Sequence, residues 1–351
     1  AAHEPEVFRR TAKFLMVEDY IVYRLTGEFA SCGGLWPSSC FYDLRTHRWA
    51  QPVLDFLRIA PDRLPALHGP GTVLARCAPD QQLLAPGTPL AGAPIDHATG
   101  ALGAGCAEEG CVSETIGCTL ALCAPHDGLL YDEGRRISTY EGFAPGQSVL
   151  LPWAPAAGML LRAFRDHFAG NLDYADLDRL AEAIAPGSEG LLLLPHCAGA
   201  VSPEVNPAAR GTAYGITLAH RPGHWARAIM ESVAFLLRDN LEVLRASGCA
   251  VTSLRALGGA SRSRLWRQIL ADVLQLPIAL PESVETTALG AAMLGAVSVG
   301  EFADCMAATR AMTRCADTVR PDPDHAAVYD RIFRQYRHLN ALLLPTFGGN
   351  L

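Results

Sequence analysis

Apolar residues recur at helical spacing in long stretches of the second half of the chain. The clearest stretch covers residues 222–246, where Pro222 stands at the start and Gly248 follows the end. Similar one-sided patterns cover 263–275 and 323–343. Each pattern predicts an amphipathic helix whose apolar face packs against a core.

Short apolar runs alternate with these helices and predict strands. One run at 253–257 comes before the helix at 263–275, and another at 278–280 leads to a further helix at 286–298. Other strands are expected at 91–95, 111–117, 190–195 and 211–217. Because strands and helices alternate along the chain, the predicted fold class is α/β.

The first 150 residues show weaker patterns. Helices are predicted at 5–17, at 19–25 before the stop signal Thr26-Gly27, and at 48–57. Segments 30–48 and 58–90 are expected to be irregular, with short strands in the second, and 124–147 is expected to be a polar surface loop.

Composition places the chain among acidic, globular proteins. It has 351 residues, half of them hydrophobic, which is enough for two domains. The net charge of −7 argues against nucleic acid as a partner. A phosphate ligand is compatible with this charge, because backbone N–H groups and helix N-termini bind anions without basic side chains.

The eleven cysteines show no Cys-x-x-Cys pair, so we expect reduced, mostly buried thiols and no structural zinc site. The N-terminus lacks the pattern of a secretory signal, and no apolar run is long enough to span a membrane. These features predict a cytoplasmic protein that does not interact with membranes.

Asp96 is the first candidate for chemistry. It follows the run at 91–95 and precedes small residues that permit a tightly packed helix. A carboxylate at a strand-to-helix junction can accept the proton of a substrate hydroxyl during phosphoryl transfer. An equally acceptable interpretation is that Asp96 only caps the helix. His97 is either a substrate contact or a hydrogen-bonded structural residue.

Two glycine-containing turns are candidates for phosphate binding. Gly117-Cys118-Thr119 follows a predicted strand and could offer backbone N–H groups and a hydroxyl, although the motif by itself favours an ordinary turn. Cys118 has no neighbouring His or Lys in the sequence, which favours an inert, buried thiol. Gly211, after Arg210, either approaches a phosphate or only permits the turn.

A stronger signal lies at Gly258-Gly259-Ala260-Ser261, between the strand at 253–257 and the next helix. Glycines leave room for a flat base or a phosphate beside the backbone, and Ser261 or Ser263 can cap the helix. Trp266, one turn later, is interpreted as a core residue.

These motifs, taken in order, resemble the FGGY family of carbohydrate kinases, and most closely its xylulokinase-like branch. The resemblance extends over nearly the whole chain. It rests on Asp19-Tyr20 with Leu25-Thr26-Gly27, on Asp96-His97-Ala98 with Gly100, Gly103 and Gly105, on Ser202-Pro203 through Asn206-Pro207 and Ala209-Arg210-Gly211 to Gly215-Ile216-Thr217, on Arg227-Ala228 with Glu231, on Leu257 to Asp272, and on Glu285 with Ala288 to Ala292.

The resemblance implies two ribonuclease-H-like domains of the actin-like ATPase class, here 1–104 for sugar and 105–351 for ATP, with Mg²⁺ and a ketose or polyol as the other ligands. It implies that Asp96 is the general base and that Asp96 and His97 contact the sugar. It places Gly117, Cys118, Thr119, Gly211, Gly258, Gly259, Ala260 and Ser263 at the nucleotide, and it assigns no residue to the metal.

Three departures from the family pattern accompany this prediction. The family's opening phosphate loop has no counterpart, so we expect an incomplete first domain whose uncovered apolar surface favours a homodimer. Cys118 replaces the usual Thr, and His97 replaces the usual Asn or Gln. The alternative function is therefore a kinase-like protein that binds nucleotide or sugar without turnover.

Overall fold

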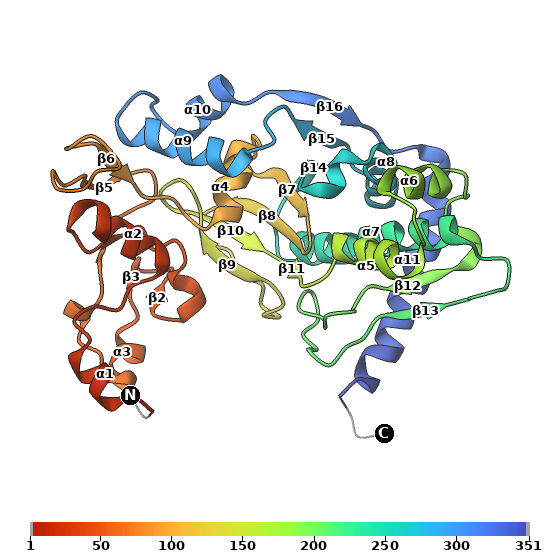
Figure 1. The fold of residues 1–351 in the computed structure, drawn as a ribbon, viewed down its shortest axis with the longest axis horizontal. Helices are drawn as coiled ribbons and strands as arrows, with labels where there is room; N and C mark the ends of the chain where they lie inside the picture. The colour runs from red at the N-terminus through yellow and green to blue at the C-terminus, as the bar shows by residue number, and fades with distance from the viewer. Residues whose placement is uncertain (1–2, 349–351) are drawn as a thin grey trace.

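The structure is a computed structural model that describes residues 3–348. A mixed eight-stranded sheet lies at its centre (Figure 1). Its strands are β7 (Gly110–Ile116), β8 (Leu120–Asp127), β9 (Ser138–Glu141), β10 (Gln147–Leu151), β11 (Trp153–Ala154), β14 (Val251–Leu257), β15 (Ile278–Pro281) and β16 (Cys315–Val319). The order is β16-β15-β14-β7-β8-β10-β9, with β11 also paired to β8. The class is therefore α/β, as predicted.

The middle of the sheet is parallel and its flanks are antiparallel. β14 pairs in parallel with both β7 and β15, so the ends of β7 and β14 lie at the same edge. β8 pairs antiparallel with β7, β10 and β11. In this register Glu114 of β7 lies opposite Leu122 of β8 and Ala256 of β14.

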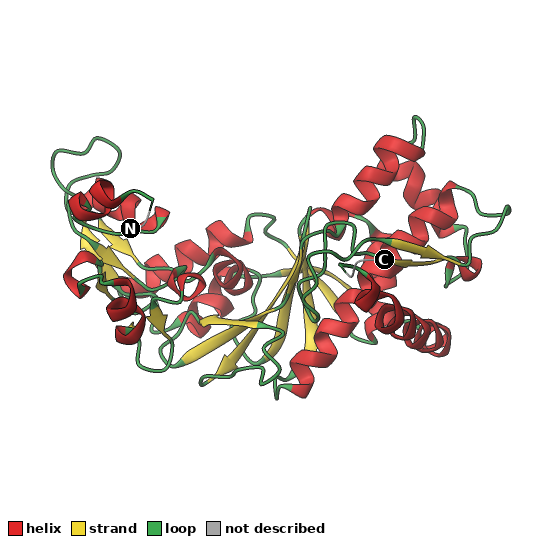
Figure 2. Cartoon of the chain, turned by 90° about the horizontal axis from the view of Figure 1, so that it is seen from below, coloured by secondary structure: helices red, strands yellow, loops and turns green. Residues whose placement is uncertain are grey.

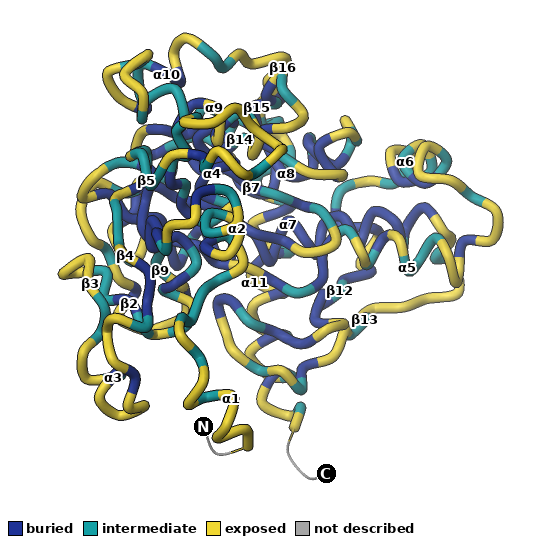
Figure 3. Tube along the Cα trace, turned by 60° about the vertical axis from the view of Figure 1, so that its left-hand side comes forward, coloured by how far each residue is buried: buried dark blue, intermediate teal, exposed yellow. Residues whose placement is uncertain are grey.

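One face of the sheet shares a large apolar core with several helices. These are α5 (Gly158–Phe168), α6 (Tyr174–Glu182), α7 (Pro222–Ala246), α8 (Arg264–Leu274) and α11 (Pro323–Leu343). α7 is buried along most of its length (Figure 3). Val112 and Ile116 of β7 join this core because alternate residues of a strand point to the same face.

The other face carries helices built from small residues, α4 (Asp96–Gly103) and α9 (Thr286–Ser298), with α10 (Cys305–Met312) beside them. A Cβ atom on Gly103 would overlap the carbonyl oxygen of Thr286, and one on Gly290 would overlap that of Thr99. The two backbones therefore approach each other more closely than any side chain would allow.

Residues before α4 form short elements around a separate small core, at the left of Figure 1. Their bounds are α1 (Pro5–Arg10), α2 (Val17–Thr26), β1 (Ala30–Ser31), β2 (Tyr42–Asp43), β3 (Arg48–Trp49), α3 (Gln51–Leu57), β4 (Ala66–Leu67), β5 (Val73–Arg76) and β6 (Pro89–Ala91). Asp19 is buried here and accepts hydrogen bonds from the Trp36 indole (2.9 Å) and the Met16 amide (3.0 Å). Its carboxylate therefore ties α2 to the following loop.

The long periodic stretches were predicted correctly. The helices predicted at 222–246, 286–298 and 323–343 are α7, α9 and α11. Figure 2 shows the helices and strands along the whole chain. Two predicted strands are shorter than expected, β12 (Leu192–Leu194) and β13 (Thr212–Tyr214), which pair with each other outside the central sheet.

Several predictions were wrong. The first helix ends at Arg10, and α3 begins only at Gln51 because residues 48–49 pair with β2. The segment 124–147 is not a surface loop, because it contains the end of β8, the whole of β9 and the buried Glu141. The sequence patterns also missed α5, α6, α10 and β16.

The strand predicted at 91–95 ends at Ala91, and a loop delivers Asp96 instead. Gly92 lies against Cys32, and Pro94 has no N–H for a strand ladder. Within the described residues, no helix combines the length and the apolar character needed to cross a bilayer.

Candidate active site

Two turns that are far apart in the sequence meet at one edge of the sheet. The turn at Gly117 follows β7, and the turn at Gly258 follows the parallel strand β14. Gly258 has φ +81°, and a Cβ on it would lie 2.7 Å from the carbonyl oxygen of Ile116. Only glycine allows this contact, so Gly258 brings the two turns together.

The start of α5 completes this junction. The Ala157 amide donates a hydrogen bond to the Cys118 carbonyl oxygen (2.9 Å). A Cβ on Gly158 would overlap the carbonyl oxygen of Gly117. The turn after β7 is therefore fixed between two glycine-dependent contacts, one on each side.

A cavity of about 540 Å³ opens over these turns. Backbone turns form one wall, and side chains of α5, α6 and α8 form the others. The lining residues are Ile116, Gly117, Cys118, Gly158, Met159, Leu161, Arg162, Tyr174, Ala175, Asp178, Gly259, Ala260, Arg262, Ser263 and Trp266. The volume lies within the range of small-molecule sites.

The walls of this cavity combine exposed backbone with a buried aromatic side chain and with positively charged side chains. A Cβ on Gly259 would meet no atom within 4 Å, so the backbone there faces open space. The Trp266 indole is buried, and its Nε1 has no hydrogen-bond partner among residues 3–348. Arg162 and Arg262 add positive charge for phosphates.

Asp178 is the one carboxylate among the lining residues, and burial raises its pKa. Ser263 caps α8, because its hydroxyl accepts a hydrogen bond from the Trp266 amide (3.0 Å). The capping role predicted for Ser263 is confirmed. Trp266 is a core residue, as predicted, and it also forms part of the cavity wall.

Asp96 is the first residue of α4, and its side chain is exposed. Its Oδ1 accepts a hydrogen bond from the His97 amide (2.8 Å), and no hydrogen bond involves Oδ2 within the described residues. The helix N-terminus favours the negative charge of this carboxylate. The cap residue of α4 is Ile95, so Asp96 does not occupy the cap position itself. Asp96 and His97 do not line the cavity.

Three other predicted residues lie outside the cavity lining. Gly258 lies behind the turns, and the Thr119 carbonyl oxygen accepts a hydrogen bond from the Gly117 amide (3.0 Å). Gly211 lies elsewhere. Cys118 does line the cavity, but its side chain is exposed, so the prediction of a buried thiol was wrong. The other cysteines are mostly buried, as expected.

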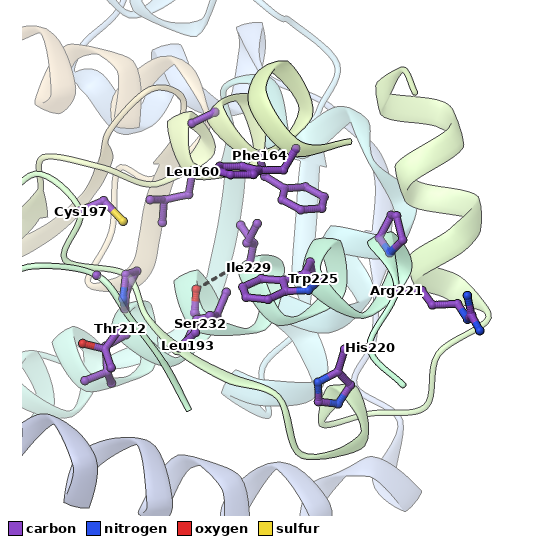
Figure 4. A pocket seen from close by; sticks show the side chains of 17 residues that line it. Leu160, Phe164, Leu193, Cys197, Thr212, His220, Arg221, Trp225, Ile229 and Ser232 are labelled. Carbon is purple, nitrogen blue, oxygen red and sulfur yellow. Dashed lines mark hydrogen bonds between the residues drawn. The ribbon is translucent and has the colours of Figure 1, made fainter. Parts of the chain in front are cut away.

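Gly211 lies in a second cavity of about 630 Å³ between α5, α7 and the β12–β13 pair. Figure 4 shows its apolar walls, with Phe164 and Trp225 among them. α5 separates the two cavities, because Leu161 and Arg162 line the first whereas Leu160 and Phe164 line the second. Gly211 is not gathered with the other predicted nucleotide residues.

Sequence reasoning missed the contributions of α5 and α6 to the first cavity, namely Gly158, Met159, Arg162, Tyr174 and Asp178. A usable signal was present. Ala156-Ala157-Gly158 is a run of small residues just before an amphipathic stretch, which is typical of a close backbone contact at a helix start.

Residues 1–103 match the profile of the FGGY family of carbohydrate kinases, N-terminal domain, and residues 133–299 match that of the same family's C-terminal domain. A solved xylulose kinase from Rhodospirillum rubrum is 31% identical, with a TM-score of 0.91, and the alignment covers 99% of this chain and 71% of that one. The chain belongs to the FGGY family of carbohydrate kinases. The members of this family are phosphotransferases with an alcohol group as acceptor.

Curated FGGY relatives agree with this assignment. Xylulose kinase of Bacillus subtilis (strain 168) is 28% identical over 345 residues, covering 96% of this chain and 68% of the relative. Gluconokinase of the same strain is 29% identical over 352 residues, with the same coverage. The fold is the two-domain, actin-like ATPase fold of these kinases.

No group of three or more His, Cys, Asp or Glu side chains that could hold a metal ion occurs within residues 3–348. Mg²⁺ in kinase sites is bound by one or two carboxylates together with the phosphates and water. Asp178 is a single carboxylate on the cavity wall, so the described residues do not identify a protein-built magnesium site.

Proposed function

We propose that this FGGY kinase transfers the γ-phosphoryl group of ATP to a hydroxyl of a xylulose-like ketose or polyol. The observation that carries the proposal is the cavity in which the turn at Gly117 and Cys118 meets Gly259, Ala260 and Ser263. These are the positions expected to contact ATP. Backbone groups at such turns can cradle phosphates without basic side chains.

The adenine ring binds in this cavity beside Met159, Tyr174 and Trp266, which are among its lining residues. The phosphates lie over the turn at Gly117 and near Arg162. Gly258 acts indirectly, since it holds the two turns in contact. Thr119 acts through its carbonyl contact with Gly117. Gly211 remains a predicted phosphate neighbour, from the second cavity.

Asp96 is the proposed general base. Its exposed carboxylate keeps Oδ2 free of hydrogen bonds among the described residues, so that atom can accept the proton of the attacking sugar hydroxyl. The hydrogen bond from the His97 amide to Oδ1 orients this carboxylate. His97 is the proposed second sugar contact. Mg²⁺, when bound to the nucleotide, neutralises phosphate charge, and no protein ligand is assigned to it.

The domain division proposed for this chemistry is 1–104 for the sugar and 105–351 for ATP. α4 ends at Gly103 and packs against α9 of the second part through Gly103 and Gly290. This contact supports the proposal, because it holds the helix that carries Asp96 against the second part. A homodimer remains a prediction that sizing chromatography tests.

The deciding experiment compares the protein with its Asp96→Asn variant, with ATP and a panel that includes xylulose, ribulose, glycerol and gluconate. We expect turnover of one ketose or polyol, and a loss of about two to four decades in kcat for Asp96→Asn with unchanged ATP affinity in calorimetry. Asp80→Asn, which changes another exposed carboxylate, serves as the control with normal turnover.

Equal turnover in the protein and its Asp96→Asn variant would remove Asp96 from the role of base. ATP binding without turnover of any sugar would favour the alternative of a non-catalytic nucleotide-binding protein, for which Cys118 in place of the usual Thr is the motivating feature.

A further inference from the structure

Two thiols lie in contact at the junction between α4 and β7. The Sγ atoms of Cys106 and Cys111 are 2.8 Å apart. Cys106 is fully buried, whereas Cys111 is partly exposed at the start of β7. The intervening loop is outside both family profiles, which end at residue 103 and begin at 133. The pair takes no part in the proposed phosphoryl transfer.

The backbone holds these thiols together. The Cys106 amide donates a hydrogen bond to the Ala101 carbonyl oxygen of α4 (2.9 Å), and Gly105 reverses the chain with φ +92°. On the other side, Cys111 lies in the β7 ladder opposite Ser253 of β14. Cys111 therefore belongs to a strand of the central sheet, whereas Cys106 lies in the loop after α4 and is tied to that helix by its backbone hydrogen bond.

The surroundings make the two thiols unequal. The hydrogen bond with Cys106 lowers the pKa of Cys111, and Arg255 and Ser253 lower it further, whereas burial and Glu108 raise it. Burial raises the pKa of Cys106 well above its usual value. A more exposed, more acidic thiol beside a buried one is the arrangement of an attacking and a resolving cysteine.

We propose that Cys106 and Cys111 form a reversible dithiol–disulfide pair that is oxidised by a hydroperoxide. The Cys111 thiolate attacks one oxygen of hydrogen peroxide, the O–O bond breaks, and hydroxide leaves and takes up a proton to become water. The Cys106 sulfur then attacks the resulting sulfenic acid on Cys111, and its proton leaves with the hydroxyl as a second water. Two thiols and one peroxide give one disulfide and two waters, and a dithiol reductant reverses the change.

The geometry requires little movement for this reaction. A disulfide bond is about 2.05 Å long, so the sulfur atoms must approach by less than ~1 Å from their present contact. Cys123 lies in the same small core but makes no hydrogen bond to either thiol within the described residues. Substitution of Cys123 therefore serves as the matched control.

The disulfide would join the loop after α4 directly to the central sheet. α4 begins at Asp96 and packs on α9, so the constraint acts on one end of the helix that carries the proposed base. Its direct physical effect is slower opening of the loop, because a cross-link reduces the conformations open to the segment. This effect does not depend on the proposed function.

The first test maps thiols before and after stoichiometric hydrogen peroxide. Free thiols are blocked with an alkylating agent, and the chain is cleaved after Glu108 and Glu109, which separates the two cysteines into different peptides. Mass spectrometry is expected to find a Cys106–Cys111 cross-link in the wild type and in Cys123→Ser, no cross-link in Cys111→Ser, and full reversal by dithiothreitol.

The second test is hydrogen exchange of residues 104–111 in the wild type, so it needs no variant that folds poorly. We expect exchange there to slow by about tenfold after oxidation and to recover on reduction. A cross-link to Cys123 would overturn the proposal. So would a protein in which Cys106 and Cys111 can still be alkylated after the exposed Cys118 has been oxidised. Unchanged exchange in the cross-linked protein would overturn the constraint on the loop.

Discussion

On one face of β8, Leu120, Leu122 and Ala124 meet the large side chains that surround α7, whereas Cys123 on the opposite face meets Ala98 and Ala101 of α4. The first face buries area through long side chains that interdigitate. The second face brings backbones together, since Gly103 and Gly290 leave no room for a methyl group. Adjacent residues of one strand therefore obey different packing rules.

The difference has a functional side. The face with small residues holds α4 and so positions Asp96, while the face with large residues holds the helices that line the cavity proposed for the nucleotide. Close backbone contact fixes the position of a short helix more strictly than contact between long side chains, because a side chain can change rotamer and a backbone cannot. Substitutions can test whether the two faces differ in this way.

The largest effect is expected on the face with large residues. Leu122→Ala should lower the free energy of unfolding by about 3 kcal/mol, because it leaves a cavity in a fully packed core. Urea denaturation measures this loss. Leu122→Met, which conserves volume, should cost less than about 1.5 kcal/mol. Equal losses of unfolding free energy in Leu122→Ala and Leu122→Met would show that the face with large residues tolerates changes of shape no better than the face with small residues.

Adding one methyl group to the other face should be nearly as damaging. Gly290→Ala should lower the free energy of unfolding by about 2–3 kcal/mol, because the new Cβ overlaps the Thr99 carbonyl oxygen. Gly295→Ala, in the same helix, meets no atom within 4 Å and should raise stability by about 0.5–1 kcal/mol through helix propensity. If both substitutions prove neutral, α4 and α9 are not held by backbone contact.

The smallest effect concerns a carboxyl group within the face with large residues. Glu114 is fully buried, neither of its oxygens has a partner among residues 3–348, and burial raises its pKa to about 8. Because the folded value exceeds the ordinary 4.5, the folded state holds the proton more tightly, and stability falls as pH rises from 4.5 toward 8.

Between pH 6 and 8 this group alone should lower the free energy of unfolding by about 2 kcal/mol. Glu114→Gln should remove that slope, as measured by denaturation at several pH values, while the exposed Glu108→Gln should retain it. A slope that survives in Glu114→Gln would show that the carboxyl is not buried as the structure places it.

The long amphipathic elements could be predicted from the sequence because their patterns are local. α7, α9 and α11 have the predicted bounds, because apolar spacing, together with the initial proline and the following glycine of α7, acts within a few turns. The short strands before α4 could not be predicted in this way. Strands as short as β1 and β4 gain their hydrogen bonds from a distant part of the chain, because residues 30–31 pair with residues 66–67.

The features of the candidate site also separate into those set by local sequence and those set by tertiary contacts. The sequence by itself determined the class of the fold, the family pattern and the glycine turns at 117 and 258, because each depends on residue types at fixed local spacing. Only the tertiary structure decided that α5 and α6 complete the cavity, that Gly211 lies in another one, that Cys118 is exposed and that two cysteines touch. Those outcomes depend on contacts between residues that are far apart in the sequence. Local patterns of side chains do not specify which distant segments will meet.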